Sequence, residues 1–412
     1  MRELFKPVVR RKRFGAAILR WFACGGIFLH LLGCSGPEEA NDEAGETPVA
    51  EPVVSADWPL FRGDPEMQGA SPERLTPPLA LGWTFEPPVE EGKRRPPIEA
   101  GPVIAGGIVY VGSQGGMFYA IKLESGELAW SVKTEGPIIG PAAVHEGIVF
   151  VGDTYGFVYA FDAASGAEQW RFETDGKIEG GMNLAKAADG TTSVLFGSHD
   201  AYLYSLKVTD GTLQWKHETG NYIVATPSLI DSGGEQAVCF GGCDGILHIV
   251  PTRLGAEKRE IEIGSFIANT SAVRDGICYI ASNGGDLLAI DVATGETSWK
   301  VHTGVEYTAS PAVDETKLYV AGPDKRLVAY DRVNGAELWA FRATRSLDSS
   351  PILTQDLIWQ GGMDGRLYAI DTSTGDLAWD FDLGSQIKAS LAVSRGVLVV
   401  CGEDGLVYGF RK

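Results

Sequence analysis

The six histidines are the side chains of this sequence with the widest chemical repertoire, because a neutral imidazole can move protons or bind a metal ion. None of them has the spacing of a Ser/His/Asp triad or of a metal-binding motif. His217 and His302 each follow a tryptophan closely, where a partly exposed strand residue is the simpler interpretation. The sequence therefore predicts no catalytic residue and no metal site, and we expect a protein that is not an enzyme. The histidines are His30, His145, His199, His217, His248 and His302.

The cysteines give no zinc or haem signature either, since no CxxC or CxxCH occurs in the sequence. Cys239 and Cys243 flank a short Gly-Gly-containing stretch, and a disulfide between them is compatible with an oxidising compartment. The alternative is that most cysteines after residue 34 are small buried hydrophobic residues, as Cys278 and Cys401 are expected to be. We leave the disulfide state of Cys239 and Cys243 open at this point.

Asp-Gly steps at Asp244, Asp364 and Asp404 raise the question of calcium loops. A calcium loop needs a run of alternating oxygen ligands, whereas a single Asp before Gly is typical of a tight hairpin turn. The glycine-rich strings lack the lysine and the following helix that a phosphate site requires. These steps therefore indicate turns between strands and not ligand sites.

The turns belong to a repeat that runs along most of the chain. A hairpin-like segment recurs seven times, and all but one copy end in Trp. A period near 40 residues built from short β-rich runs predicts a β-propeller. The final residues of the copies are Trp130, Trp170, Trp215, Arg259, Trp299, Trp339 and Trp379.

Each repeat contains four expected strands, the last of which carries the Trp. In the run Leu367–Asp371, alternation sends Leu367 and Ala369 to one face of the sheet and Tyr368 and Ile370 to the other. Both faces are apolar, as expected for a blade that lies between two neighbouring blades.

The number of blades follows from an incomplete repeat at residues 390–412, which lacks its Trp strand. A matching strand occurs around Trp83 and Phe85, so we expect this N-terminal strand to complete the last blade and close the ring. The predicted fold is an all-β, eight-bladed propeller of four-stranded antiparallel blades. The inner strands are expected to begin near Gly101, Pro141, Gly181, Thr226, Thr270, Ser310, Ser350 and Ser390.

The pattern A-x-D-x-x-T-G-x-x-x-W occurs at Ala369–Trp379 and again at Ala289–Trp299. It resembles the tryptophan-docking repeat of pyrroloquinoline quinone (PQQ) dehydrogenase-type propellers, over about residues 58–412. The resemblance implies that the tryptophans dock neighbouring blades, and the packing of large flat rings supports the same role. The docking residues would be Trp83, Trp130, Trp170, Trp215, Trp299, Trp339 and Trp379.

The N-terminus has the pattern of an export signal followed by a tether. A basic region and a short apolar run in residues 1–33 end at Leu31-Leu32-Gly33-Cys34, which resembles a lipobox with Cys34 as the lipid attachment site. Residues 34–57 contain many acids and few bulky apolar groups, which predicts a flexible acidic tether before the propeller at 58–412. Ser35 after the cysteine favours the outer membrane over the inner membrane, by resemblance to bacterial lipoprotein sorting.

A lipoprotein of this size with eight such blades resembles the BamB family of the outer-membrane β-barrel assembly machine. This resemblance implies a non-enzymatic scaffold that faces the periplasm and binds envelope proteins, which could include β-barrel assembly components. The alternative is a PQQ-binding dehydrogenase or a ligand-sensing propeller. Those dehydrogenases are longer and carry vicinal cysteines, and no Cys-Cys pair occurs here. We therefore expect no cofactor, with PQQ as the alternative.

The positions just before the inner strands should surround the mouth of the central channel and vary from blade to blade. Of these, the polar ones are the candidate interaction ring: Glu99, Glu179, Thr308, Asp348 and Lys388. The full set counted from the sequence is Glu99, Ile138, Glu179, Val224, Ala268, Thr308, Asp348 and Lys388. A ring of mixed polar residues with no partner is the alternative interpretation.

The charge of the chain limits its partners. The formal charge is −19, and without residues 1–34, which carry seven Lys or Arg and one Glu, it falls to −25. Such an acidic surface disfavours nucleic acid and favours basic or neutral partners.

Overall fold

The computed structural model describes residues 57–89, 91–187, 190–232, 235–253 and 257–412. The predicted signal peptide 1–33, the lipid attachment site Cys34 and the tether up to residue 56 lie outside these residues. Within the described part of the chain, no helix has the length and apolar character needed to cross a membrane.

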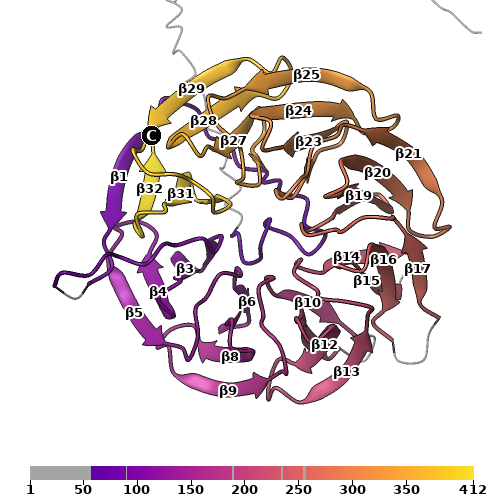
Figure 1. Cartoon of the computed structure of the whole chain (residues 1–412). Coiled ribbons are helices and arrows are strands. Elements are labelled where there is room, and N and C mark those ends of the chain that lie inside the picture. Colours follow the sequence, from indigo (N-terminus) through magenta and orange to yellow (C-terminus); the bar gives the residue numbers. More distant parts are fainter. Residues whose placement is uncertain (1–56, 90, 188–189, 233–234, 254–256) are drawn as a thin grey trace, which may run out of the picture. The chain divides into compact units, whose positions relative to one another are not determined.

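The described residues form eight four-stranded antiparallel sheets arranged as the blades of a closed ring (Figure 1). This confirms the predicted eight-bladed propeller. Blades 1 to 4 consist of β2 (Val103–Ala105), β3 (Ile108–Gly112), β4 (Met117–Lys122) and β5 (Leu128–Lys133); β6 (Ala143–His145), β7 (Ile148–Gly152), β8 (Phe157–Asp162) and β9 (Glu168–Glu173); β10 (Asn183–Lys186), β11 (Thr192–Gly197), β12 (Tyr202–Lys207) and β13 (Leu213–Glu218); β14 (Ser228–Ser232), β15 (Glu235–Gly241), β16 (Ile246–Pro251) and β17 (Arg259–Glu262).

The second half of the ring repeats this order. Blades 5 to 8 consist of β18 (Ala272–Arg274), β19 (Ile277–Ala281), β20 (Asp286–Asp291) and β21 (Thr297–His302); β22 (Ala312–Val313), β23 (Lys317–Ala321), β24 (Arg326–Asp331) and β25 (Glu337–Arg342); β26 (Ile352–Leu353), β27 (Leu357–Gly361), β28 (Arg366–Asp371) and β29 (Leu377–Asp382); β30 (Ala392–Ser394), β31 (Val397–Cys401), β32 (Val407–Arg411) and β1 (Ala80–Phe85).

The ring closes as the sequence predicts. β1 pairs antiparallel with β32 and becomes the outer strand of blade 8, with Thr84 opposite Tyr408. The two faces of each blade pack against different neighbours: on β28, Leu367 and Ala369 belong to the apolar cluster shared with blade 8, whereas Tyr368 belongs to the cluster shared with blade 6. The core therefore consists of apolar layers between blades.

An N-terminal arm, residues 57–75, lies inside the ring (Figure 1). The sequence predicts no strand for this segment. The inner strand of each blade is a sheet edge with unpaired backbone groups, and the arm hydrogen-bonds to these edges. Trp58 exchanges two backbone hydrogen bonds with Ile104 of blade 1. Backbone carbonyls of the arm also accept hydrogen bonds from Val144, Leu229, Val273, Val313 and Leu353, in blades 2, 4, 5, 6 and 7.

Side chains complete the set of contacts between the arm and the blades. The Asn183 amide of blade 3 donates to the carbonyl of Pro65 at 2.8 Å. The Glu73 carboxylate accepts hydrogen bonds from the backbone N–H groups of Arg395 and Gly396 in blade 8, at 2.6 and 2.8 Å. The arm therefore contacts all eight blades and crosses the channel.

Candidate functional site

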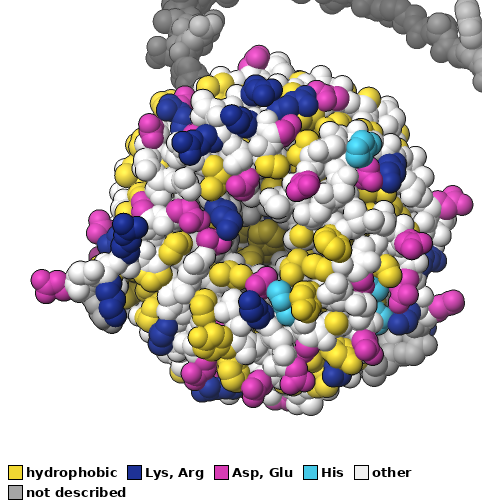
Figure 2. All heavy atoms as spheres, viewed as in Figure 1, with side chains coloured by type: hydrophobic (Ala, Val, Ile, Leu, Met, Phe, Trp, Pro, Cys, Tyr) yellow, Lys and Arg dark blue, Asp and Glu magenta, His cyan; other side chains and the backbone are white. Residues whose placement is uncertain are grey.

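The mouth of the channel is formed by the residues that directly precede the inner strands. Glu99, Thr308, Asp348 and Lys388 line one cavity of about 590 Å³, together with Phe61 of the arm. Figure 2 shows the hollow at the centre of the disc, with charged side chains around it. Because the arm contributes to the lining and crosses the channel, the cavity is a well and not an open pore.

One position of the predicted ring needs correction. Ile138 is fully buried between blades, and it is Ile139 that lines the well. The equivalent buried residues before the other mouth positions include Ile98, Leu347 and Ile387. The count from the sequence was wrong by one residue in blade 2, because the side chains alternate between the blade core and the channel.

Charged groups at the well are paired with one another. Lys388 Nζ lies 2.6 Å from one carboxylate oxygen of Glu99, and the Gln114 amide donates to the other at 2.6 Å. Burial, and secondarily the negative charge of Glu99, raises the pKa of the nearby Glu403 carboxyl. With Glu99, Glu306 and Asp348 against a single Lys388, the lining carries an excess of negative charge.

Glu179 is the member of the predicted ring that does not line this well. Its carboxylate lies 3.0 Å from His199 Nε2, and the His199 ring stacks on Tyr222 with the ring centroids 4.7 Å apart. The side chain of Tyr222 is half exposed. The structure thus brings four of the five predicted residues to one cavity and places Glu179 in a separate cluster with His199 and Tyr222.

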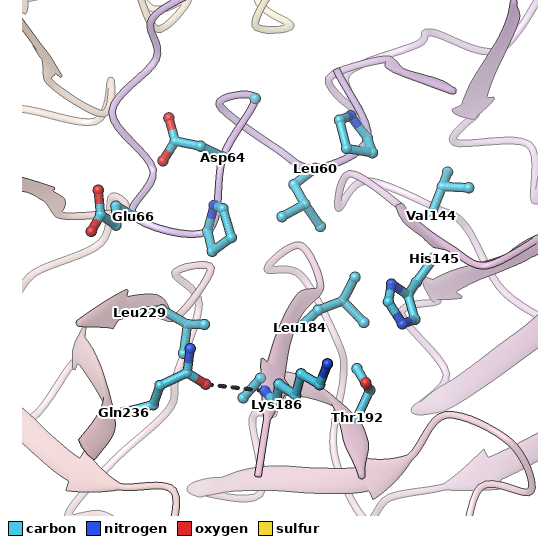
Figure 3. A pocket seen from close by; sticks show the side chains of 14 residues that line it. Leu60, Asp64, Glu66, Val144, His145, Leu184, Lys186, Thr192, Leu229 and Gln236 are labelled. Atoms are coloured by element: carbon cyan, nitrogen blue, oxygen red, sulfur yellow. Dashed lines mark hydrogen bonds between the residues drawn. The ribbon is translucent and has the colours of Figure 1, made fainter. Parts of the chain in front are cut away.

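A second cavity of about 570 Å³ lies at the other end of the inner strands, between the arm and blades 2 to 4 (Figure 3). Leu60 of the arm points towards Leu184 across it, and the backbone N–H of Lys186 donates to the Gln236 side chain at 3.0 Å. Sequence analysis missed this cavity, because the arm that forms one wall has no repeat.

Arg62 and Asp64 are two ionisable groups of the arm with shifted pKa values. The Arg62 guanidinium is buried and donates to the carbonyls of Pro351 and Pro311, at 2.5 and 2.8 Å. Burial lowers the pKa of Arg62 to about 9, so the side chain is still charged at neutral pH. Burial raises the pKa of Asp64 to about 6.

The docking tryptophans make the same contact at one blade interface after another. Each indole faces a small residue on the adjoining strand of its own blade, such as Ala329 opposite Trp339. Five of the indoles donate to a backbone carbonyl of the next blade at 2.8–3.2 Å, namely Trp83, Trp130, Trp170, Trp299 and Trp339. Trp215 and Trp379 occupy the same register, opposite Ser205 and Ala369.

The five indoles that donate to the next blade also pack on one of its glycines. Gly335, with a φ of +73°, lies against Trp299, and a Cβ at that position would come within 2.7 Å of the indole ring. The glycine of the Thr-Gly and Asn-Gly steps is therefore required for two reasons: it adopts a positive φ, and it leaves space for the indole.

Arg259 takes over the docking contact in blade 4. Its guanidinium donates to the carbonyl of Val292 at 2.5 Å, and its side chain lies against Gly295. The residue opposite it is Ile249 and not a small one, which leaves less space for an indole. The donor to the next blade is therefore retained although the tryptophan is not.

The cysteines and histidines partly depart from the expectations. The four described cysteines are free, and the Cys239 thiol lies 3.1 Å from the Sγ of Cys278 in the next blade, so the structure points to Cys278 and not Cys243 as its neighbour. His302 is exposed, as expected, but His217 is buried, contrary to the expectation of a partly exposed strand residue.

The closed ring of eight blades, the indole contacts and the arm across the channel define a tryptophan-docked β-propeller. The sequence profile of the family described as outer membrane protein assembly factor BamB matches residues 80–301, 255–357 and 324–412. The chain belongs to this family. A curated member from Moranella endobia (strain PCIT) is 24% identical over 222 residues, which cover 50% of this chain and 55% of that relative.

Solved structures show the same fold. BamB from Moraxella catarrhalis matches with a TM-score of 0.67 and 21% identity, over 81% of this chain and 98% of that chain. A quinohemoprotein alcohol dehydrogenase from Comamonas testosteroni matches with a TM-score of 0.71 and 15% identity, over 86% of this chain and 80% of that chain. At these identities the likeness concerns the fold, which an assembly factor and an enzyme share.

Proposed function

We propose that the protein is a non-enzymatic, BamB-like interaction scaffold that is anchored to the outer membrane through a lipid on Cys34. The channel-mouth face binds an envelope protein in the periplasm. The family supports this proposal, and so does the lipobox-like sequence at Leu31–Cys34.

The observation that carries the proposal is the well at the channel mouth. Its lining combines residues from non-adjacent blades, such as Glu99, Thr308 and Asp348, and these differ in type although the blades themselves repeat. Phe61 of the arm adds an apolar surface to the lining. A concave site of this kind, apolar within and polar at the rim, suits a protruding loop of a partner, and its negative charge favours a neutral or basic loop.

The well does not fit PQQ, the cofactor of the alternative function. PQQ carries three carboxylate groups, whereas the lining presents the carboxylates of Glu99, Glu306 and Asp348 and one cation, Lys388. Placing like charges together in a partly enclosed site costs binding energy. We therefore assign no step to PQQ in this protein.

Affinity capture from detergent-solubilised envelope tests the proposal. Wild-type protein is expected to recover β-barrel assembly components, identified by mass spectrometry. The double variant Thr308→Lys/Asp348→Lys reverses the charge of the well and is expected to recover at least about tenfold less, equivalent to about 1.4 kcal/mol. Lys186→Glu, at the opposite end of the inner strands, is the matched control and should recover as much as wild type.

Two results would contradict the proposal. If the double variant recovers the same proteins as wild type, the well is not part of the binding interface. A spectral change on mixing the protein with PQQ and Ca²⁺ would support the dehydrogenase alternative. Anchoring is tested separately, because Cys34→Ser should move the protein from the membrane fraction to the soluble periplasmic fraction.

A further inference from the structure

Three potential metal ligands meet at the interface between blades 3 and 4, on strands that lie outside the inner strands of these blades. His217 lies on β13, the outer strand of blade 3, whereas His248 and Glu260 are directly opposite each other on β16 and β17 of blade 4. One ligand atom from each of the three residues lies within 4.8 Å of the others. Ligand atoms bound about 2 Å from one zinc ion are roughly 3 to 4 Å apart, so a small side-chain rotation completes the set.

The two imidazoles have buried nitrogen atoms without hydrogen-bond partners. His217 is 8% exposed and His248 is 2% exposed, and neither His217 Nε2 nor His248 Nδ1 has a partner in the described part of the protein. The carboxylate of Glu260 is 3.8 Å from His248 Nδ1, which is too long for a hydrogen bond. Buried polar atoms are normally satisfied, so two such atoms in one cluster point to a ligand between them.

The orientation of His248 is fixed by a carboxylate on its other side. His248 Nε2 lies 2.9 Å from Asp244 Oδ2, and the Asp244 side chain is itself buried. A proton on Nε2 leaves the lone pair of Nδ1 directed towards His217 and Glu260. This carboxylate–histidine arrangement is the one that supports histidine ligands in metal sites.

The other blade interfaces show that packing alone does not call for histidine here. At several of them the residue two positions after the docking Trp meets an aromatic ring of the next blade: Phe172 meets Tyr204 and Phe341 meets Tyr368, with the ring centroids 5.8 and 5.2 Å apart. The remaining interfaces have aliphatic residues at this position, such as Val301. His217 and His248 occupy these two positions, so both members of an aromatic pair have become imidazoles together. His248 also keeps the contact to an Asp four residues earlier, which Tyr204 and Tyr368 make through their hydroxyl groups.

The surrounding charges are compatible with a cation. Lys258 Nζ lies 3.5 Å from the Glu260 carboxylate and would be displaced by an ion. Glu260 is about half exposed, which leaves a path for the ion and a place for water as the fourth ligand.

We propose that His217 Nε2, His248 Nδ1 and the carboxylate of Glu260 bind one divalent transition-metal ion, zinc by preference, that connects blades 3 and 4. Two imidazoles and a carboxylate are ligands that suit Zn²⁺. This replaces the expectation from the sequence that the protein has no metal site, and it is independent of the envelope partner.

Titration of the chelator-treated full chain with Zn²⁺ by calorimetry tests the site. We expect one ion per chain, an increase in the thermal denaturation midpoint, and with Co²⁺ the intense visible absorption of a four-coordinate ion. His248→Ala should abolish all three results. His302→Ala, which removes an exposed histidine of the next blade, is the control and should leave them unchanged.

Two further variants separate loss of the site from loss of folding. His217→Phe/His248→Tyr restores the aromatic pair of the other interfaces, and is expected to fold as well as wild type without binding zinc. Glu260→Gln changes a half-exposed side chain and should weaken zinc binding at least about tenfold. Two results would overturn the proposal. The wild-type protein could fail to bind Zn²⁺, or the folded His217→Phe/His248→Tyr variant could bind Zn²⁺ as tightly as wild type.

Discussion

The tryptophans at the outside of the ring and the N-terminal arm at its centre hold the same blades together in opposite ways. The outer contact repeats: Trp83, Trp299 and Trp339 each donate to a carbonyl of the next blade and pack on a glycine. The arm contacts each inner strand once, with a different residue each time. A repeated contact leaves a period in the sequence, whereas a segment that meets eight sites in turn leaves none.

The two regions therefore differ in whether their contacts recur from blade to blade. The outer contacts follow the repeat and recur from blade to blade. At the centre, Phe61 lines the well and Arg62 binds two inner strands, and neither contact recurs. Four substitutions compare the strength of the two regions.

The largest expected effect is in the outer region. Trp299→Ala removes an indole that is 9% exposed, packs on Gly335 and donates to the carbonyl of Arg332. The free energy of unfolding should fall by about 4 kcal/mol, as for other buried Trp truncations. Denaturant titration followed by circular dichroism measures this change. Val333→Ala, at a highly exposed position, is the control, and a loss below about 1 kcal/mol for Trp299→Ala would show that the outer contact is dispensable.

Arg62→Met measures the central region. The substitution keeps an unbranched apolar chain but leaves the carbonyls of Pro311 and Pro351 without their charged donor. We expect a loss of about 3 kcal/mol, since hydrogen bonds to charged groups contribute roughly 1.5–3 kcal/mol each. Arg74→Met removes another arginine of the arm, from an exposed ion pair with Asp356, and should cost less than about 1 kcal/mol. Equal losses in the two variants would contradict the role given to burial.

Arg259 tests whether the outer contact depends on the indole or on its hydrogen bond. Arg259→Ala removes the donor to Val292 from an exposed side chain, and the free energy of unfolding should fall by about 1.5 kcal/mol. Arg259→Trp should not raise stability above wild type, because Ile249 occupies the place that Ala or Ser has in other blades. A clear gain from Arg259→Trp, measured by the same titration, would contradict this explanation.

The smallest effect concerns pH. Burial raises the pKa of Asp64 to about 6, so the folded protein holds this proton more tightly than the unfolded chain does. Ionisation of Asp64 therefore lowers stability above about pH 6, and this contribution is recovered as the pH falls towards 4. Asp64→Asn should raise the free energy of unfolding at pH 7 by on the order of 1 kcal/mol and should have no such effect at pH 4. A stabilisation that is the same at both pH values would exclude Asp64 ionisation as its cause.

The sequence was sufficient for the fold because the propeller is built from local hairpins that repeat. The Trp83 motif even located the closing strand, which is now seen opposite β32. The mouth could be located only to within one residue, as Ile138 shows, because a strand's side chains change faces at every step.

The arm and the histidine pair could not be found in the same way. The arm's contacts depend on the completed ring, and nothing in residues 57–75 identifies their partners. His217 and His248 lie in different blades, so their separation along the chain resembles no motif. Aligning the repeats would have shown two histidines in columns that hold aromatic or aliphatic residues elsewhere, but only the packing of blades 3 and 4 shows that these columns meet.

The pairing of β1 with β32 also has a consequence for biosynthesis. β1 is made early and waits without its partner while seven blades are synthesised, so the ring cannot be sealed until the ribosome has completed β32. A nonsense mutation at Val407, which removes β32, would therefore affect more than one edge strand. It would leave β1 unpaired and the ring open, and we expect proteases to degrade the truncated protein.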